Sequence, residues 1–163
     1  MEKYDISQKI VFKTGTYELN NDANFNFQLN RVIMWDGGDA DEISAVSHRI
    51  KTSSDWVSTM EQLAEKAHAE NRTVNEIAYL RMSEFFIYDT NPKKKQRYQK
   101  ACDLFYAYYS EYFDRGIVQR HKVPYCGGCL PVMVTKAKGT SKGAILLHGG
   151  NDSYYEELFF PML

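Results

Sequence analysis

The chain has 163 residues, of which 44% are hydrophobic and 14% aromatic, and its formal net charge at pH 7 is −1. This length fits one domain, or a small domain with a piece of another, and the apolar content is sufficient for a core. The near-neutral charge argues against nucleic acid or an anionic membrane as a partner, and no apolar run approaches the roughly 18–20 residues that span a bilayer.

The N-terminus and the cysteines both indicate an intracellular protein. Residues 1–12 lack the long apolar stretch of a secretory signal. Three cysteines, an odd number, fit a reducing compartment. We therefore expect a cytoplasmic location, with no nucleic-acid or membrane partner.

Residues 1–23 are weakly patterned and are interpreted as an N-terminal arm, in which Ile10–Phe12 form a short strand or remain irregular. From Asn24 the spacing of the apolar residues predicts a helix that ends at Gly37-Gly38. The alternation of apolar residues in 25–29 leaves a strand open there. Asp39 or Asp41 then caps a second, short helix.

Three stronger helical signals follow. Ser53, Ser54 and Asp55 are cap candidates for a helix with an apolar stripe of Trp56, Met60, Leu63, Ala64 and Ala67. Thr73 and Glu76 have the capping-box spacing and begin a helix with one side formed by Ile77, Ala78, Arg81, Phe85 and Tyr88.

The last of these helices begins at Asn91-Pro92 and is closed by Gly116. Its stripe consists of Tyr98, Ala101, Cys102, Phe105, Tyr109 and Tyr112. Core packing is the favoured interpretation of this stripe, with a binding groove as the alternative. The basic run Lys93–Lys95 is interpreted as a solvated helix start, with an anionic partner as the alternative.

Composition changes at Gly116, and a β-rich segment begins. Three β-like runs are expected, at Ile117–Val123, Leu130–Thr135 and Ala144–Leu147, and the short loops between them favour antiparallel neighbours. A final helix over Tyr154–Leu163 is expected to start with a capping box formed by Ser153 and Glu156, with Asp152 as the alternative cap. The predicted fold is mainly α with a small β part: arm 1–23, helical domain 24–115, and a β-containing segment 116–163.

The turn His148-Gly149-Gly150 between the third run and the last helix carries the chemical signal. Two glycines leave backbone N–H groups without side-chain cover, and a helix start directs further N–H groups into the same space. Such a turn can stabilise the oxyanion of acyl transfer, with His148 orienting it. The alternative is a tight strand-to-helix loop without a functional role.

The segment VPYCGGCLPVMVTKAKGTSKGAILLHGGNDSYYEEL resembles the α/β-hydrolase superfamily, most closely its acylaminoacyl- or dipeptidyl-peptidase-like members, 2,6-dihydroxypseudooxynicotine hydrolase and FrsA-like esterases. FNFQLNRVIMWDGGDADEI, YLRMSEFF and YQKACDLF are similar to the helical cap that precedes the core in those proteins. The resemblance implies an oxyanion hole formed by backbone amides at Gly149, Gly150 and Asn151, supported by His148, Asp152 and Ser153. It also implies hydrolysis of a small-molecule or peptide-like acyl substrate.

No catalytic triad is expected in this chain. The string Gly139-Thr140-Ser141 is expected in a hairpin turn before the third predicted strand, whereas the family's nucleophile lies on the fifth strand and is followed by the acid and the histidine of the triad. The sequence thus resembles the N-terminal part of a serine hydrolase, truncated before the nucleophile elbow and inactive alone. Exposed strand edges and apolar residues of the last helix predict self-association.

Two further readings stay open. Cys126-Gly127-Gly128-Cys129 is interpreted as a hairpin turn, with a redox or metal role as the alternative; no cofactor or metal is expected. The helix starts near residues 54, 73 and 92 are evenly spaced, which leaves a helical protein-interaction module without catalytic activity as the alternative function.

Overall fold

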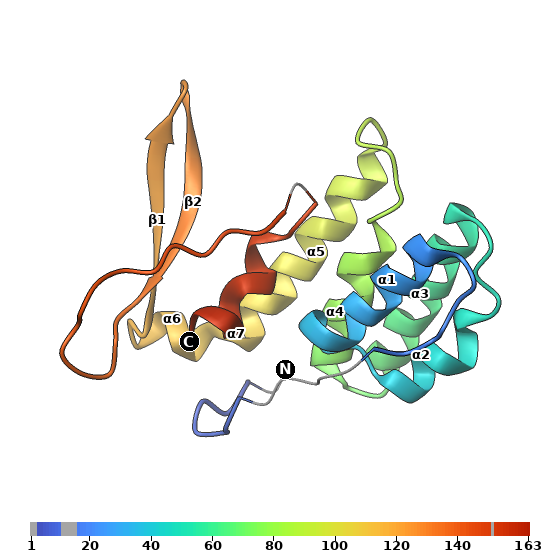
Figure 1. Ribbon diagram of the computed structural model, residues 1–163, viewed down its shortest axis with the longest axis horizontal. Coiled ribbons are helices and arrows are strands. Elements are labelled where there is room, and N and C mark those ends of the chain that lie inside the picture. The colour runs from blue at the N-terminus through green and yellow to red at the C-terminus, as the bar shows by residue number, and fades with distance from the viewer. Residues whose placement is uncertain (1–2, 11–15, 151) are drawn as a thin grey trace. The chain divides into compact units, whose positions relative to one another are not determined.

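The computed structural model describes residues 3–10, 16–150 and 152–163. In these residues the chain is mainly helical with a small β part, as the sequence predicts, and the β part is one two-stranded antiparallel sheet (Figure 1). Backbone contacts divide it into two units, residues 11–106 and residues 1–10 with 107–163. The predicted division into 1–23, 24–115 and 116–163 stays a prediction, and most of the possible strand at Ile10–Phe12 lies outside the described residues.

The first unit contains α1 (Ala23–Arg31), the π-helical turn η1 (Val32–Asp36), α2 (Ala40–Ser47), α3 (Ser53–Ala69), α4 (Thr73–Ser83) and most of α5 (Pro92–Tyr108). The helical reading from residue 24 is correct and the strand alternative is wrong. The pair Gly37-Gly38 predicts the end of the first helical stretch. The stretch does end at Gly37, whose φ is 85°. Helix α3 packs on α4, and α4 packs on η1 (Figure 1).

The core of this unit follows the predicted stripes. Trp56 is fully buried, and its Nε1–H donates to the carbonyl oxygen of Met82 over 2.7 Å, which ties α3 to α4. Rings of Phe25 and Phe86 pack against the indole. The other large buried apolar side chains are Leu29, Val32, Ile33, Ile43, Ile50, Met60, Leu63, Ile77, Tyr79, Leu80 and Met82.

The structure decides between the cap candidates at the starts of α2 and α3. Asp39 caps α2, accepting from the N–H groups of Asp41 and Glu42 at 3.0 Å. The cap of α3 is Thr52, which forms a capping box with Asp55, so Ser53 and Ser54 are the first helical residues and not the cap.

The predicted capping box of α4 is wrong. Thr73 lies inside the helix, the residue before it makes no side-chain cap bond, and the Glu76 carboxylate is 3.1 Å from Nδ1 of His68. Helix α4 also ends at Ser83, so Tyr88 lies beyond it and is exposed instead of continuing the stripe.

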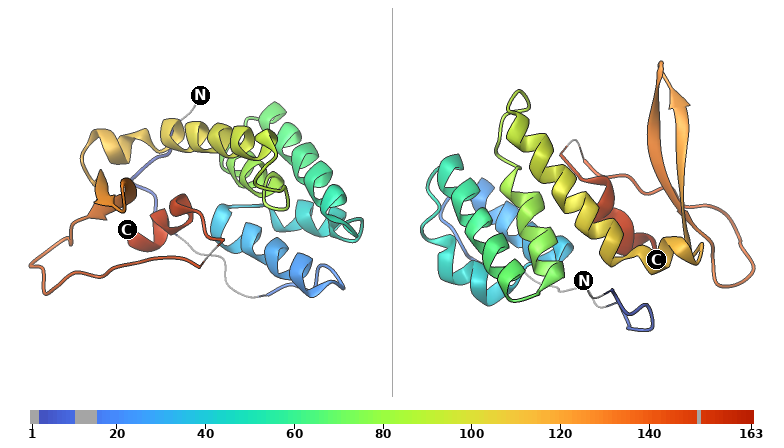
Figure 2. Two further views of the ribbon diagram at one scale, coloured as in Figure 1. Left: turned by 90° about the horizontal axis from the view of Figure 1, so that it is seen from above. Right: turned by 180° about the vertical axis from the view of Figure 1, so that it is seen from behind.

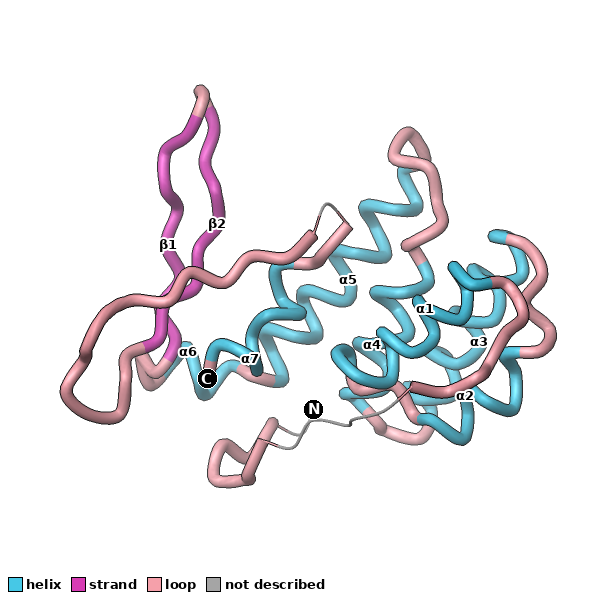
Figure 3. The backbone as a smooth tube through the Cα atoms, viewed as in Figure 1, coloured by secondary structure: helices cyan, strands magenta, loops and turns pink. Residues whose placement is uncertain are grey.

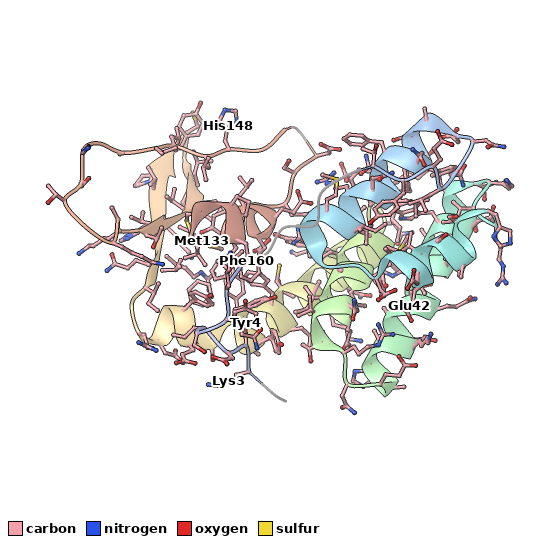
Figure 4. All side chains as sticks on the ribbon, turned by 60° about the horizontal axis from the view of Figure 1, so that its bottom comes forward. Lys3, Tyr4, Glu42, Met133, His148 and Phe160 are labelled. Carbon is pink, nitrogen blue, oxygen red and sulfur yellow. The ribbon has the colours of Figure 1, made fainter. Side chains whose placement is uncertain are left out.

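The second unit holds the end of α5, α6 (Ser110–Asp114), the hairpin β1 (Val118–Tyr125) and β2 (Gly128–Thr135), the 3₁₀ turn η2 (Tyr155–Leu158) and α7 (Phe159–Met162). The predicted helix from Pro92 is interrupted at Tyr109, between α5 and α6. Tyr4 packs beside Phe160 (Figure 4) and belongs to a ring cluster with Tyr108, Tyr109, Tyr112, Phe113 and Phe159.

The predicted hairpin is correct and longer than expected. Its register runs from Val118 opposite Thr135 to Tyr125 opposite Gly128, so the loop has only the two residues Cys126 and Gly127. Apart from Val118, every residue of β1 is exposed, and the right-hand view of Figure 2 shows the two strands side by side.

The predicted third strand is wrong. Residues 136–154 contain no helix or strand among those described (Figure 3). Ile145 and Leu146 are 89% and 85% exposed. A strand forms only where a neighbour accepts and donates its backbone hydrogen bonds, and Ala144–Leu147 pairs with neither strand of the hairpin. The physical cause is the lack of a partner, not the composition of the run.

Candidate functional site

The glycine turn predicted to bind an oxyanion lies in the irregular segment before η2. His148 is exposed, and its Nδ1–H donates to the carbonyl oxygen of Gly149 over 3.0 Å. Its ring projects from the loop in Figure 4. A bond to the adjacent residue does not orient a general base, so the structure gives His148 no triad-like arrangement.

Gly149 is sterically required in this turn. A Cβ atom built on Gly149 would overlap the side chain of Ser153. The side chain of Ser153 thus occupies the space that the glycine leaves open. Any other residue at position 149 would displace Ser153 and open the turn.

The amide predicted to be an oxyanion donor is already hydrogen-bonded. The Gly150 N–H donates to Oγ of Ser153 over 2.9 Å, and the Ser153 N–H donates back to the Gly150 carbonyl over 3.2 Å. Ser153 therefore closes the turn instead of capping the helix. Asn151, the third predicted oxyanion residue, lies outside the described residues, and Asp152 is exposed on the turn.

The predicted capping box of Ser153 and Glu156 is wrong, because the Ser153 hydroxyl accepts from the Gly150 amide and not from the helix. The residue before η2 is Tyr154, which makes no side-chain cap bond, and Glu156 is buried. The helical part is also short, since η2 and α7 have four residues each. A dipole from so short a helix adds little to the turn.

Tyr155, the first residue of η2, has a shifted pKa. Burial raises its pKa to about 12, and Glu156 adds to the shift, although the charge of Arg120 acts in the opposite direction. The phenol therefore stays protonated at neutral pH. It can donate a hydrogen bond but cannot act as a base there.

The sequence around Ser141 has the letters Gly-x-Ser-x-Gly, because Lys142 and Gly143 follow it. The structure places it in the irregular, exposed segment, with neither a strand before it nor a helix after it. Its hydroxyl donates to the carbonyl oxygen of Gly143 over 3.0 Å. A nucleophile elbow requires a strand–turn–helix setting, which the described residues around Ser141 do not form; that the chain carries no catalytic triad stays a prediction.

The sequence reading missed a polar network in the first unit. The Glu42 carboxylate accepts from both terminal nitrogens of Arg72 at 3.0 and 2.8 Å and from the Tyr79 hydroxyl at 2.9 Å, and it pairs with Lys66 at 2.7 Å. Burial alone would raise the pKa of Glu42, but hydrogen bonds from these three residues outweigh it and lower the pKa. The carboxylate of Glu42 is hydrogen-bonded to all three partners. We therefore interpret the network as a structural link between α2, α3 and α4 and not as a reactive site.

A shallow hollow of about 390 Å³ lies beside the starts of α3 and α5. Apolar side chains of Val57, Phe86 and Ile87 line it together with Lys93. Its two other charged residues, Glu61 and Arg97, form an ion pair with each other. The hollow offers no acid–base pair of the kind that hydrolysis needs.

Comparison of the sequence with protein-family models and with curated proteins gives no match. Among the described residues, no helix is of the length and apolarity that a bilayer crossing requires.

Proposed function

We propose that this chain supplies the helical N-terminal region, the first hairpin and the oxyanion turn of a serine hydrolase of the α/β-hydrolase type. The substrate class is an acyl ester or amide. The nucleophile, its histidine and its acid would come from residues other than those of this chain.

The observation that carries the proposal is the exposure of the apolar run directly before the glycine turn. The side chains of Ile145 and Leu146 are 89% and 85% exposed, so neither belongs to the core of this chain. A run of this kind leading into Gly-Gly fits a strand of a larger sheet, in which both of its faces would be covered. The resemblance in the same segment supports the same arrangement.

The proposed chemistry needs one rearrangement of the turn. The Gly150 N–H would leave Ser153 Oγ and donate to the oxyanion of the tetrahedral intermediate, while the amides beside it add further donors. Exchanging one acceptor for another costs little, since a neutral hydrogen bond contributes only about 0.5–1.5 kcal/mol. A charged oxygen is the stronger acceptor of the two.

The test starts with the product of the chain's own locus. Its intact mass is measured, it is treated with a serine-directed fluorophosphonate, and acyl-ester hydrolysis is assayed. We expect a product larger than the 18.9 kDa of this chain, covalent labelling and hydrolysis. A product of 18.9 kDa that neither labels nor hydrolyses would overturn the proposal.

A matched pair of variants tests the role of the turn. Gly150→Pro removes the proposed N–H donor, and Gly143→Pro makes the same change in the exposed segment upstream. We expect Gly150→Pro to lower kcat by roughly 10²–10³-fold and Gly143→Pro to leave it nearly unchanged. Equal kcat values for the two variants would remove the oxyanion role.

A further inference from the structure

The tip of the β1–β2 hairpin presents two thiols. Cys126 occupies the first position of the two-residue loop, and Cys129 is the second residue of β2, opposite Pro124. Both cysteines are exposed and free. The residues between them, Gly127 and Gly128, have no side chains to shield the thiols.

Cys126 has an unusual backbone conformation for its type. Its φ is 43°, and φ of Gly127 is 76°. Two-residue hairpin loops with both φ values positive favour Asn, Asp or Gly at the first position, because other side chains are strained there. A cysteine at this position therefore weakens the turn, and a role of its thiol would account for its presence.

The spacing and setting of the pair suit a soft, tetrahedral metal ion. Zinc sites in proteins commonly take two of their four ligands from a C-x₂-C pair. In the described part of the chain, no group of three or more histidine, cysteine or acidic side chains is placed to hold an ion. One chain thus offers two thiolates at this tip and leaves two positions of a tetrahedral ion open.

We propose that the hairpin tip is half of a zinc-type site, which the same two cysteines of a second copy of this chain complete. Each of the four thiols loses its proton on binding, and the ion holds the two hairpins tip to tip. Lys122 on the neighbouring strand is exposed and offsets part of the negative charge of the four thiolates.

A second copy is the occupant because it brings the same two thiols, which fill the two positions that one chain leaves open on a tetrahedral ion. Val123, Tyr125 and Leu130 alternate along the register so that their side chains share one face of the hairpin. All three are exposed, with Tyr125 at 62%. Cys129 pairs with Pro124 and therefore lies on the opposite face, so the shared ion, and not burial of these three side chains, would hold the two hairpins together.

The experiment is a titration of the reduced 163-residue chain with Co²⁺, under a phosphine reductant that prevents disulfides, followed by light scattering. We expect the ligand-field bands of a tetrahedral thiolate complex, which saturate at one ion for every two chains. The scattering mass should double from 18.9 kDa and return to that value when a chelator is added. Zinc should displace cobalt and bleach the bands.

The variants separate a metal site from a plain turn. Cys126→Asn places a residue that tolerates positive φ in the loop, so the hairpin should be at least as stable, whereas the cobalt bands and the metal-dependent dimer should be lost. Cys129→Ser should lose both as well. Cys102→Ala, which removes the buried third cysteine, should keep them.

Three results would overturn the proposal. They are no cobalt binding by the reduced chain, saturation at one ion per monomeric chain, and unchanged binding in Cys126→Asn. Association through the apolar run 144–147 is independent of metal, so the chelator distinguishes it from the proposed dimer. Failure of this site leaves the proposed hydrolase role untouched, since the two rest on different segments.

Discussion

The amide of Gly150 donates to the hydroxyl of Ser153 over 2.9 Å, which closes the glycine turn on itself. The same amide is the donor that the proposed oxyanion hole needs. The Ser153 hydroxyl therefore accepts the hydrogen bond that the proposed function assigns to the oxyanion. The resemblance assigns Gly150 to the oxyanion hole and Ser153 to its support. In the structure the two residues are hydrogen-bonded to each other.

Ser153→Ala should release the Gly150 amide. Because the lost bond is a neutral one, we expect amide hydrogen exchange at Gly150 to speed up by between about twofold and tenfold. Nuclear magnetic resonance detects the exchange at this single amide. Ser141→Ala, which removes another exposed hydroxyl of the same segment, serves as the control, and an equal effect of both variants at Gly150 would contradict the assignment.

Ile145→Asp combined with Leu146→Asp should not destabilise this chain. Both side chains are exposed, so we expect the free energy of unfolding to change by less than about 0.5 kcal/mol, while self-association decreases. Urea unfolding and size-exclusion chromatography measure the two effects. In a longer product with a completed sheet, the same pair should prevent folding because it buries two charges.

Val118→Asp is the matched control for that pair. Val118 is 2% exposed at the base of the hairpin, so a carboxylate there loses its hydration. We expect destabilisation by roughly 2–4 kcal/mol in the 163-residue chain itself. If Val118→Asp changed the free energy of unfolding as little as the Ile145→Asp, Leu146→Asp pair, the difference in burial between the two sites would be contradicted.

Glu42→Gln should weaken the first unit at neutral pH. The variant loses the charge that pairs with Arg72 and Lys66, and we expect a cost of about 2 kcal/mol in the free energy of unfolding. Glu65→Gln on α3 makes the same chemical change at an exposed position and should cost less than about 0.5 kcal/mol. Urea unfolding at pH 7 compares the two.

The contribution of Glu42 also predicts a pH dependence. Hydrogen bonds lower its pKa in the folded chain, so its stabilisation is complete above its ordinary pKa of 4.5 and is lost as the pH falls through the folded value. We expect the difference between wild type and Glu42→Gln to shrink below about pH 4. A difference that is constant down to acid unfolding would show that the carboxylate charge is irrelevant.

Trp56→Phe should destabilise the contact between α3 and α4. The change leaves a cavity and removes the hydrogen bond to the buried Met82 carbonyl, which together should cost about 2–4 kcal/mol. Thermal unfolding followed by circular dichroism measures the loss. Tyr88→Phe, at an exposed ring, should leave the midpoint unchanged.

Local chemistry determined much of this fold. The stripe from Trp56 to Ala67 predicts a helix that is buried on that side, because helical periodicity is a property of adjacent turns. Gly37 and Gly116 end helical stretches with positive φ, as glycine alone does without strain. The even helix starts are also present at Ser53, Thr73 and Pro92, and the interaction-module alternative that they suggested stays a prediction.

Only the tertiary structure decided which groups meet across long separations. Glu42 and Tyr79 are 37 positions apart, and nothing in either neighbourhood indicates the other. Ala144–Leu147 has the composition of a strand, yet a strand needs a partner that composition cannot supply. Ser153 has the spacing of a cap, but its hydroxyl reaches Gly150 instead. The sequence thus determined the existence of the helices and of the hairpin, because periodicity and turn residues are local. Pairing across space decided several of their ends, the caps of α3 and α4, the lack of a third strand and the hydrogen bond that closes the glycine turn.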